Sequence, residues 1–261
     1  KNLIPDINLT PYSIWLATVV VSGISYLSYL LKRYVFHESG TLVSGIIGGL
    51  YSSTATISVL ARKSRKASEQ EATEYVAAML LAVSMMFLRF MILILIFSRE
   101  IFLSIYPYLL IMSVVSAIVG WFIHSRQKLP KDTSVESEED DSSNPLEFKV
   151  ALIFAVLFVV FTVLTHYTLV YAGTSGLNLL SFVSGFSDIT PFILNLLQNT
   201  GSVAVLIITA CSMQAIVSNI LVNMFYALFF AGKRSKLRPW ILGGFGAVIA
   251  CNLVLLLFFY L

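Results

Sequence analysis

Charged residues are scarce in this chain of 261 residues. Asp, Glu, Lys and Arg make up only 12% of it, whereas 57% is hydrophobic and the mean hydropathy is +0.86. A water-soluble core does not hide that much apolar surface, so a soluble globular protein is excluded. The net charge of +3 forms no long basic stripe, which argues against nucleic acid as a partner. We expect the partner to be a lipid bilayer.

Cysteine is rare and catalytic signatures are lacking. Cys211 and Cys251 lie in apolar runs without the spacing of a zinc or redox site, so we interpret them as small buried side chains. No nucleophile elbow, P-loop, HExxH motif or catalytic pair of carboxylates is found. The sequence therefore predicts a protein that is not an enzyme, and it identifies neither a cofactor nor a metal.

Long apolar segments are what the sequence does contain. A bilayer core of about 30 Å needs about 20 mainly apolar residues per helix. Six segments meet this requirement: residues 11–31, 75–97, 101–123, 150–171, 203–230 and 239–261. Two more, 40–61 and 176–197, are long enough but are interrupted by polar residues. Because the runs are continuously apolar and do not alternate, the sequence predicts an all-α polytopic membrane protein.

A hydrophilic stretch divides the chain into two halves. Residues 124–149 contain "RQKLPKDTSVESEEDDSSN", a composition that predicts a disordered acidic linker between repeat 1 (1–123) and repeat 2 (150–261). When the halves are shifted by 136 residues, positions 39–64 face 175–200. Six of these 26 positions are identical: Ser39/Ser175, Gly40/Gly176, Gly49/Gly185, Thr54/Thr190, Ile57/Ile193 and Leu60/Leu196. Such duplication is common in transporters.

Basic residues distinguish two topologies. If both interrupted stretches cross the membrane, eight spanning helices form two parallel four-helix repeats, and Lys and Arg divide nine to seven between the faces. If both are re-entrant hairpins, two inverted repeats each have three transmembrane helices and one hairpin, and the division is fourteen to two. The positive-inside rule expects such asymmetry. We therefore favour inverted repeats, with the linker cytoplasmic and the termini outside, and keep eight spans as the alternative.

Each predicted hairpin has a polar tip, where a second half-helix begins and its first N–H groups lack internal partners. Ser52, Ser53 or Thr54 is suited to cap it in the first hairpin. Asp188 is suited to cap it in the second, where Pro191 fits an early helical position. Two tips entering from opposite faces would meet near the midplane, where a substrate path is expected. Capping alone and a pathway both fit the sequence.

Arg89 is the sharpest single signal, because it lies about 12 Å from the end of its predicted helix. A charge at this depth costs about 2.5 to 3.5 kcal/mol on insertion scales, so we expect it to face the protein interior or water. Its expected partner is Asp188, the one acidic residue in a predicted intramembrane stretch, or carbonyl groups at half-helix ends. A structural ion pair and contact with an anionic substrate both remain open.

The helix after the second hairpin carries "SMQAIVSNILVN". Gln214 and Ser218 are four residues apart, as are Asn219 and Asn223, so both pairs project toward adjoining parts of one face. A lined cavity and hydrogen bonding between helices are alternative interpretations. The predicted pathway comprises Ser52, Ser53, Thr54, Thr56, Arg89, Asp188, Thr190, Gln214, Ser218, Asn219 and Asn223.

Two motifs carry a family resemblance. "GLYSSTA" at 49–55, followed by "FLRFM", and "SGFSDIT" at 184–190 resemble the C-terminal domain-of-unknown-function portion of MgtC/SapB-type bacterial membrane proteins. Members usually carry an MgtC-like membrane region before this portion. The resemblance implies a multi-pass protein of the bacterial inner membrane and an association with magnesium homeostasis.

These observations lead to two hypotheses of function. The first is a transporter or channel for a small ion or solute, with its pathway at the two hairpin tips. The second is a membrane regulatory or scaffold protein that transports nothing, with a dry, packed interior around Arg89. A homo-oligomer is compatible with either.

Overall fold

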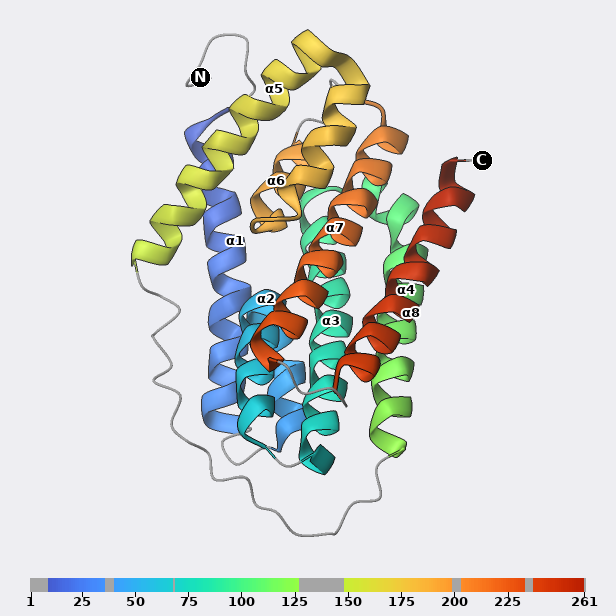
Figure 1. The fold of residues 1–261 in the computed structure, drawn as a ribbon. Helices are drawn as coiled ribbons and strands as arrows, with labels where there is room; N and C mark the ends of the chain where they lie inside the picture. The colour runs from blue at the N-terminus through green and yellow to red at the C-terminus, as the bar shows by residue number, and fades with distance from the viewer. Residues whose placement is uncertain are drawn as a thin grey trace.

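The computed structural model describes residues 9–35, 40–67, 69–126, 148–198, 203–232 and 237–260. Within these ranges the chain is helical and contains no strand. The elements are α1 (Pro11–Leu30), η1 (Leu31–Val35), α2 (Thr41–Lys66), α3 (Glu69–Phe97), α4 (Arg99–Ser125), α5 (Phe148–Ser184), α6 (Ile189–Gln198), α7 (Val205–Ala231) and α8 (Leu237–Tyr260). Figure 1 shows them as a bundle of helices, most of them roughly along one axis.

Helix starts follow from local capping chemistry. At the start of α1, the Thr10 hydroxyl oxygen accepts a hydrogen bond from the Ser13 N–H, and the Ser13 hydroxyl oxygen accepts one from the Thr10 N–H, which makes a capping box. Pro11 stands at the first position of this helix. Ser98 caps α4 in the same way, by accepting from the Ile101 N–H. Both caps allow a long helix to begin abruptly.

Seven helices of the described chain, all except η1 and α6, are long and apolar enough to cross a membrane by length and composition. Burial inside the bundle differs among them. It is greatest for α7 and α3, at 61% and 56% of the most apolar window, and lowest for α1, at 17%. The chain is therefore a multi-pass membrane protein in which α3 and α7 are central and α1 is peripheral.

Helix α2 is long enough to span but folds back on itself. Its helical dihedrals break at Ser52, where φ is −157° and ψ is 108°. A Cβ built on Gly48 would lie 2.5 Å from the Thr56 Oγ1 atom, whereas residues eight apart in a straight helix are separated by about 12 Å. Residues 41–51 and 53–66 are therefore antiparallel half-helices, and Figure 1 shows them side by side.

Helix α5 bends sharply at Gly173. The φ of +58° and ψ of −150° there belong to a region that only glycine enters readily. Residues 148–172 form a spanning helix, and residues 174–184 turn back into the bundle (Figure 1). After the turn at 185–188, α6 returns beside them. This is the second hairpin.

The two halves have opposite orientations. In Figure 1 the α2 hairpin enters from the lower end of the bundle and the hairpin of residues 174–198 enters from the upper end. Each half adds three spanning helices: α1, α3 and α4 in the first, and the first part of α5, α7 and α8 in the second. The predicted inverted repeats are confirmed. The eight-span alternative is wrong, because both interrupted stretches fold back. Most of the predicted linker, residues 127–147, lies outside the described residues.

Equivalent contacts recur 136 positions apart. A Cβ on Gly49 would lie 2.6 Å from the Ala82 backbone, and a Cβ on Gly185 would lie 2.3 Å from the Ser218 side chain. These two pairs are exact counterparts at the offset that the sequence suggested. Each hairpin thus packs its first half-helix closely against the spanning helix that follows it, through a small residue.

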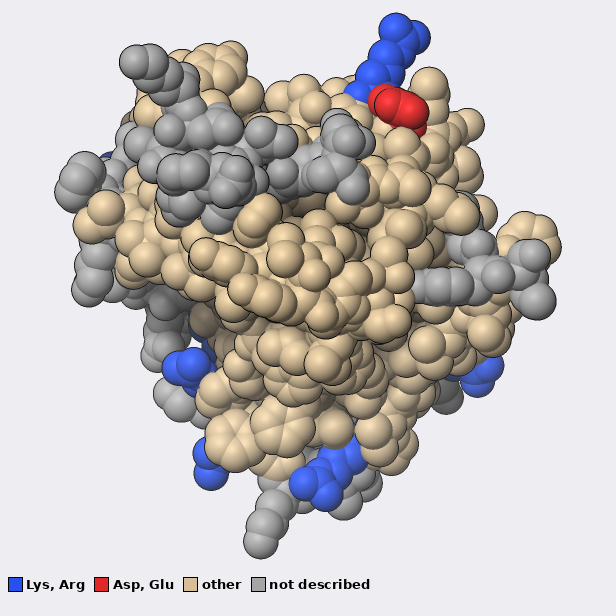
Figure 2. Space-filling model, turned by 90° about the horizontal axis from the view of Figure 1, so that it is seen from above, with Lys and Arg blue, Asp and Glu red and all other residues tan. Residues whose placement is uncertain are grey.

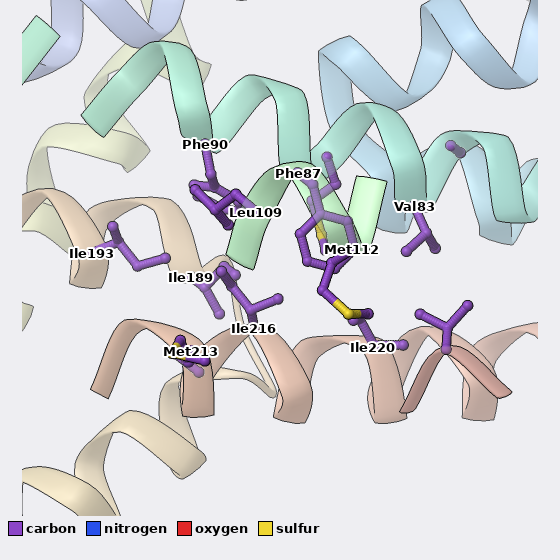
Figure 3. Packing of buried hydrophobic residues seen from close by; sticks show 14 of the residues in the cluster. Val83, Phe87, Phe90, Leu109, Met112, Ile189, Ile193, Met213, Ile216 and Ile220 are labelled. Carbon is purple, nitrogen blue, oxygen red and sulfur yellow. The ribbon is translucent and has the colours of Figure 1, made fainter. Parts of the chain in front are cut away.

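The apolar core lies where α3, α4, α6 and α7 meet. Figure 3 shows Phe87 and Phe90 of α3 facing Ile216 and Ile220 of α7, with Ile193 of α6 nearby. All five are buried, and α6 itself is buried along almost its whole length. The returning arm of the second hairpin, α6, is therefore part of the core.

Candidate functional site

A cavity of about 470 Å³ lies where the two hairpin tips meet. Residues 51–55 of the first tip and 186–190 of the second line it together, with side chains from α1, α3, α5 and α7. The tips enter from opposite ends of the bundle, so their shared cavity lies between those two ends. Irregular backbone at membrane depth is tolerated where it is buried in protein or lines a cavity, and both tips line this one.

The first tip is a single non-helical residue that caps the returning half-helix. The Ser52 Oγ atom accepts from the Ala55 N–H at 3.3 Å, so Ser52 is the cap among the three predicted candidates. Ser53 is 7% exposed and Thr54 partly exposed, and both line the cavity. The cap is neutral, so this tip contributes no charged side chain of its own.

Arg89 of α3 reaches the same tip. Its Nη1 donates to the Tyr51 carbonyl at 2.7 Å, at the carboxyl end of the entering half-helix, where a cation is favourable. The side chain is only 9% exposed, and its Nε is buried without a hydrogen-bond partner. Among the described residues, Arg89 makes no ion pair with Asp188. The expected carbonyl partner is therefore confirmed, and the direct ion pair is absent.

The second tip carries a charged cap. The Asp188 Oδ1 atom accepts from the Thr190 N–H at 2.9 Å, and Pro191 stands at the third position of α6. The carboxyl end of the entering half-helix is satisfied by α7, since the Ser218 hydroxyl donates to the Phe182 carbonyl at 2.7 Å and Asn219 Nδ2 donates to the Gly185 carbonyl at 3.2 Å. Asp188 itself is exposed and lines the cavity.

The structure brings most of the predicted pathway residues together. Seven of them line the cavity: Ser52, Ser53, Thr54, Arg89, Asp188, Thr190 and Asn219. The other four lie off it: Thr56, Gln214, Ser218 and Asn223.

Each of these four has a packing role. Thr56 packs against Gly48 inside the first hairpin. The Gln214 side-chain oxygen accepts a hydrogen bond from the Ser181 hydroxyl, and the Ser218 hydroxyl donates one to the Phe182 carbonyl. Asn223 Nδ2 donates to Asn219 Oδ1 at 3.1 Å. Hydrogen bonding between helices therefore describes Gln214 and Ser218, which bond to residues of α5, whereas the Asn223 bond stays within α7.

Sequence reasoning missed several lining residues. Ser22 and Ser25 of α1 contribute hydroxyls to the cavity, and Tyr226 of α7 and Ser187 of the second tip also line it. The spacing of three between Ser22 and Ser25 puts both on one helix face, a signal that could have identified them. In the described residues, no group of three His, Cys, Asp or Glu side chains is placed to hold a metal ion.

The fold and the site define a class of polytopic α-helical membrane protein, with two inverted repeats whose re-entrant hairpins meet at a shared cavity. The chain belongs to the family described as "Domain of unknown function (DUF4010)", which matches residues 19–231. An "Uncharacterized protein" of Aquifex aeolicus (strain VF5) is 26% identical over 224 residues, covering 85% of this chain and 96% of that relative. No solved structure matches.

Proposed function

We propose that the protein is a membrane transporter or channel that moves a small ion or solute past the two hairpin tips. The observation that carries the proposal is the cavity of about 470 Å³ formed by both tips inside the spanning bundle. Its volume falls within the range of small-molecule sites. Discontinuous helices whose ends point at a midplane site are a recurrent construction in transporters, because free helix ends bind ions and polar groups.

The distribution of charge supports an orientation. The α2 ends, the α4 end and the α8 start lie at the lower end in Figure 1 and include Arg62, Arg65, Arg126 and Arg238. The upper end, seen in Figure 2, shows few charged groups over its described surface. By the positive-inside rule, we propose that the lower end is cytoplasmic and the termini are outside. The inner membrane of a bacterium is what the resemblance to MgtC/SapB-type proteins implies.

The regulatory or scaffold hypothesis predicts a packed interior at Arg89. A cavity there favours transport over that hypothesis. The resemblance to MgtC/SapB-type proteins, with its link to magnesium homeostasis, stays a prediction, because the family that matches carries no functional description.

Access to the tips from both sides of the membrane tests the proposal. Thr54 or Ser187 would be replaced by Cys, one at a time, in a chain carrying Cys211→Ser and Cys251→Ser. Intact cells and inverted vesicles would then be treated with a membrane-impermeant thiol reagent. A pathway predicts labelling of both positions from both sides, since a carrier or channel exposes its site to each face in turn or at once.

A matched control is Ser84→Cys, which lies at a buried contact where the Ser84 and Ser113 side chains are 3.0 Å apart. This position should remain unlabelled in both preparations. Tips that label from one side only, together with no flux of any ion or solute in proteoliposomes, would overturn the proposal.

A further inference from the structure

The two tips carry opposite charges at one cavity. Arg89 donates a hydrogen bond to the first tip, Asp188 is part of the second tip, and both side chains line the cavity. Each is held by its own hairpin: Arg89 by the Tyr51 carbonyl and Asp188 by the Thr190 N–H. The two charges are thus fixed at separate places and do not neutralise one another by contact.

The half-helix ends do not erase this separation. Each tip brings together one carboxyl end and one amino end, which carry about −0.5 and +0.5 of a charge. These two contributions cancel within each tip. What remains is the positive charge of Arg89 at the first tip and the negative charge of Asp188 at the second, so the cavity is dipolar.

Arg89 has unused capacity for a ligand. A guanidinium has five N–H donors, and this one makes a single hydrogen bond, through Nη1, within the described residues. The buried Nε lacks a partner. Because that Nε has almost no accessible surface, a ligand in the cavity would bind the terminal Nη groups. A guanidinium that lines the cavity, is more than nine-tenths buried and makes one hydrogen bond among the described residues has donors left for an anionic group.

Asp188 offers the complementary group. One of its oxygens caps α6, while the side chain as a whole stays exposed toward the cavity. The surrounding lining contributes neutral hydroxyl and amide groups, including Ser25, Ser53 and Asn219, and no second acid. A single carboxylate among neutral donors and acceptors suits one ammonium or quaternary ammonium group.

We propose that the cavity binds a small zwitterion, with its carboxylate at Arg89 and its cationic group at Asp188. This inference rests on the proposed function and names its substrate class. A simple anion would leave Asp188 unpaired beside it, and a simple cation would leave Arg89 unpaired. An anion at Arg89 would be repelled by the Asp188 carboxylate and a cation at Asp188 by the Arg89 guanidinium, so either simple ion should bind more weakly than a zwitterion.

A binding screen on the purified full-length chain tests this assignment. Thermal unfolding would be followed with the twenty proteinogenic amino acids and glycine betaine. Any compound that raises Tm would be compared with its carboxylic acid lacking the amino group and with its amine lacking the carboxylate. We expect at least one zwitterion to bind, and both singly charged analogues to bind at least tenfold more weakly.

Variants assign the two charges. Asp188→Asn retains a side-chain oxygen for the cap, so it should fold and should reduce the preference for the zwitterion over its carboxylic acid at least tenfold. Arg89→Gln should instead remove the advantage over the amine. Arg99→Gln and Glu100→Gln remove the same charges at exposed positions away from the cavity and should change neither preference.

The failures are distinguishable. Equal binding of a simple carboxylate and a zwitterion, or selectivity that Asp188→Asn leaves unchanged, would overturn the zwitterion assignment and leave transport standing. No response to any class of compound, together with one-sided labelling of the tips, would overturn both.

Discussion

The two hairpins share one architecture but differ in where their charge lies. In the first hairpin, the neutral Ser52 caps the returning half-helix, and the cationic Arg89 donates a hydrogen bond to the last carbonyl of the entering half-helix. In the second hairpin, the anionic Asp188 caps the returning half-helix, and the neutral Ser218 and Asn219 donate hydrogen bonds to carbonyls at the end of the entering half-helix. Ser52 and Asp188 are exact counterparts at the 136-residue offset.

This difference teaches that the backbone scaffold and the chemistry of the site are separable. Both repeats need a cap, a set of donors for the entering half-helix and a small residue at the packing contact. Either a neutral or a charged side chain meets the first two needs. The repeats make opposite choices, and the result is a symmetric fold around an asymmetric cavity.

The largest expected effect comes from disrupting the packing of one hairpin. Gly49→Leu adds a side chain where even a Cβ would lie 2.6 Å from the Ala82 backbone, which cannot move aside. We expect a loss of about 3 kcal/mol in the free energy of unfolding, the upper part of the range for overpacked cores, measured by denaturant titration in micelles. Gly23→Leu on α1, where nothing lies within 4 Å of the added Cβ, is the control and should be close to neutral.

The bend that creates the second hairpin comes next. Gly173→Ala places a Cβ on a residue with φ of +58° and should cost about 1 to 3 kcal/mol through backbone strain alone, since no atom lies within 4 Å. The same titration would show this loss. Gly243→Ala also meets no neighbour but has no positive φ, so an equal loss there would contradict the explanation.

The caps should differ in strength between the hairpins. Asp188→Ala should destabilise the protein by about 1 kcal/mol, because it removes both a cap and a favourable charge at the α6 amino end. Ser52→Ala removes only a 3.3 Å hydrogen bond and should cost less. Thermal unfolding of the two variants side by side measures the difference, and a larger loss for Ser52→Ala would reverse the comparison.

The smallest effect is expected at the donors from α7. Ser218→Ala removes one hydrogen bond to the Phe182 carbonyl and should cost about 0.6 kcal/mol, the average measured for such bonds within membranes. Its counterpart in the first repeat is Ala82, so the variant makes the two contacts chemically alike. A loss of several kcal/mol would show that Ser218 does more than satisfy one carbonyl.

Much of the fold could be predicted because the signals were global. Apolar length gave the six spanning segments, and the charge division of fourteen to two, with the repeat at 136 residues, gave the two hairpins. Asp188 could be predicted as a cap, and Ser52 as one of three candidates, because N-capping depends on local chemistry. Helix ends were harder to place: α3 begins at Glu69, six residues before the predicted span.

The site was only partly predictable, because spacing along one helix shows which side chains share a face but not what that face contacts. Gln214, Ser218 and Asn223 share the predicted surface of α7, yet they bond to their own repeat. Ser22 and Ser25 reach the cavity only because α1 packs beside it. The Tyr51 carbonyl became the partner of Arg89 through the three-dimensional position of the tip.

Crosslinking the two tips tests the central claim most directly. Ser52→Cys and Ser187→Cys would be introduced together in the chain carrying Cys211→Ser and Cys251→Ser, with a protease site between Arg126 and Phe148. After treatment with a short bismaleimide and cleavage, the account predicts that the two halves stay joined on a denaturing gel. A control pair, Ser52→Cys with Leu206→Cys at the start of α7, should separate. Separation of the halves in the tip pair as well would contradict the meeting of the two hairpins at one cavity.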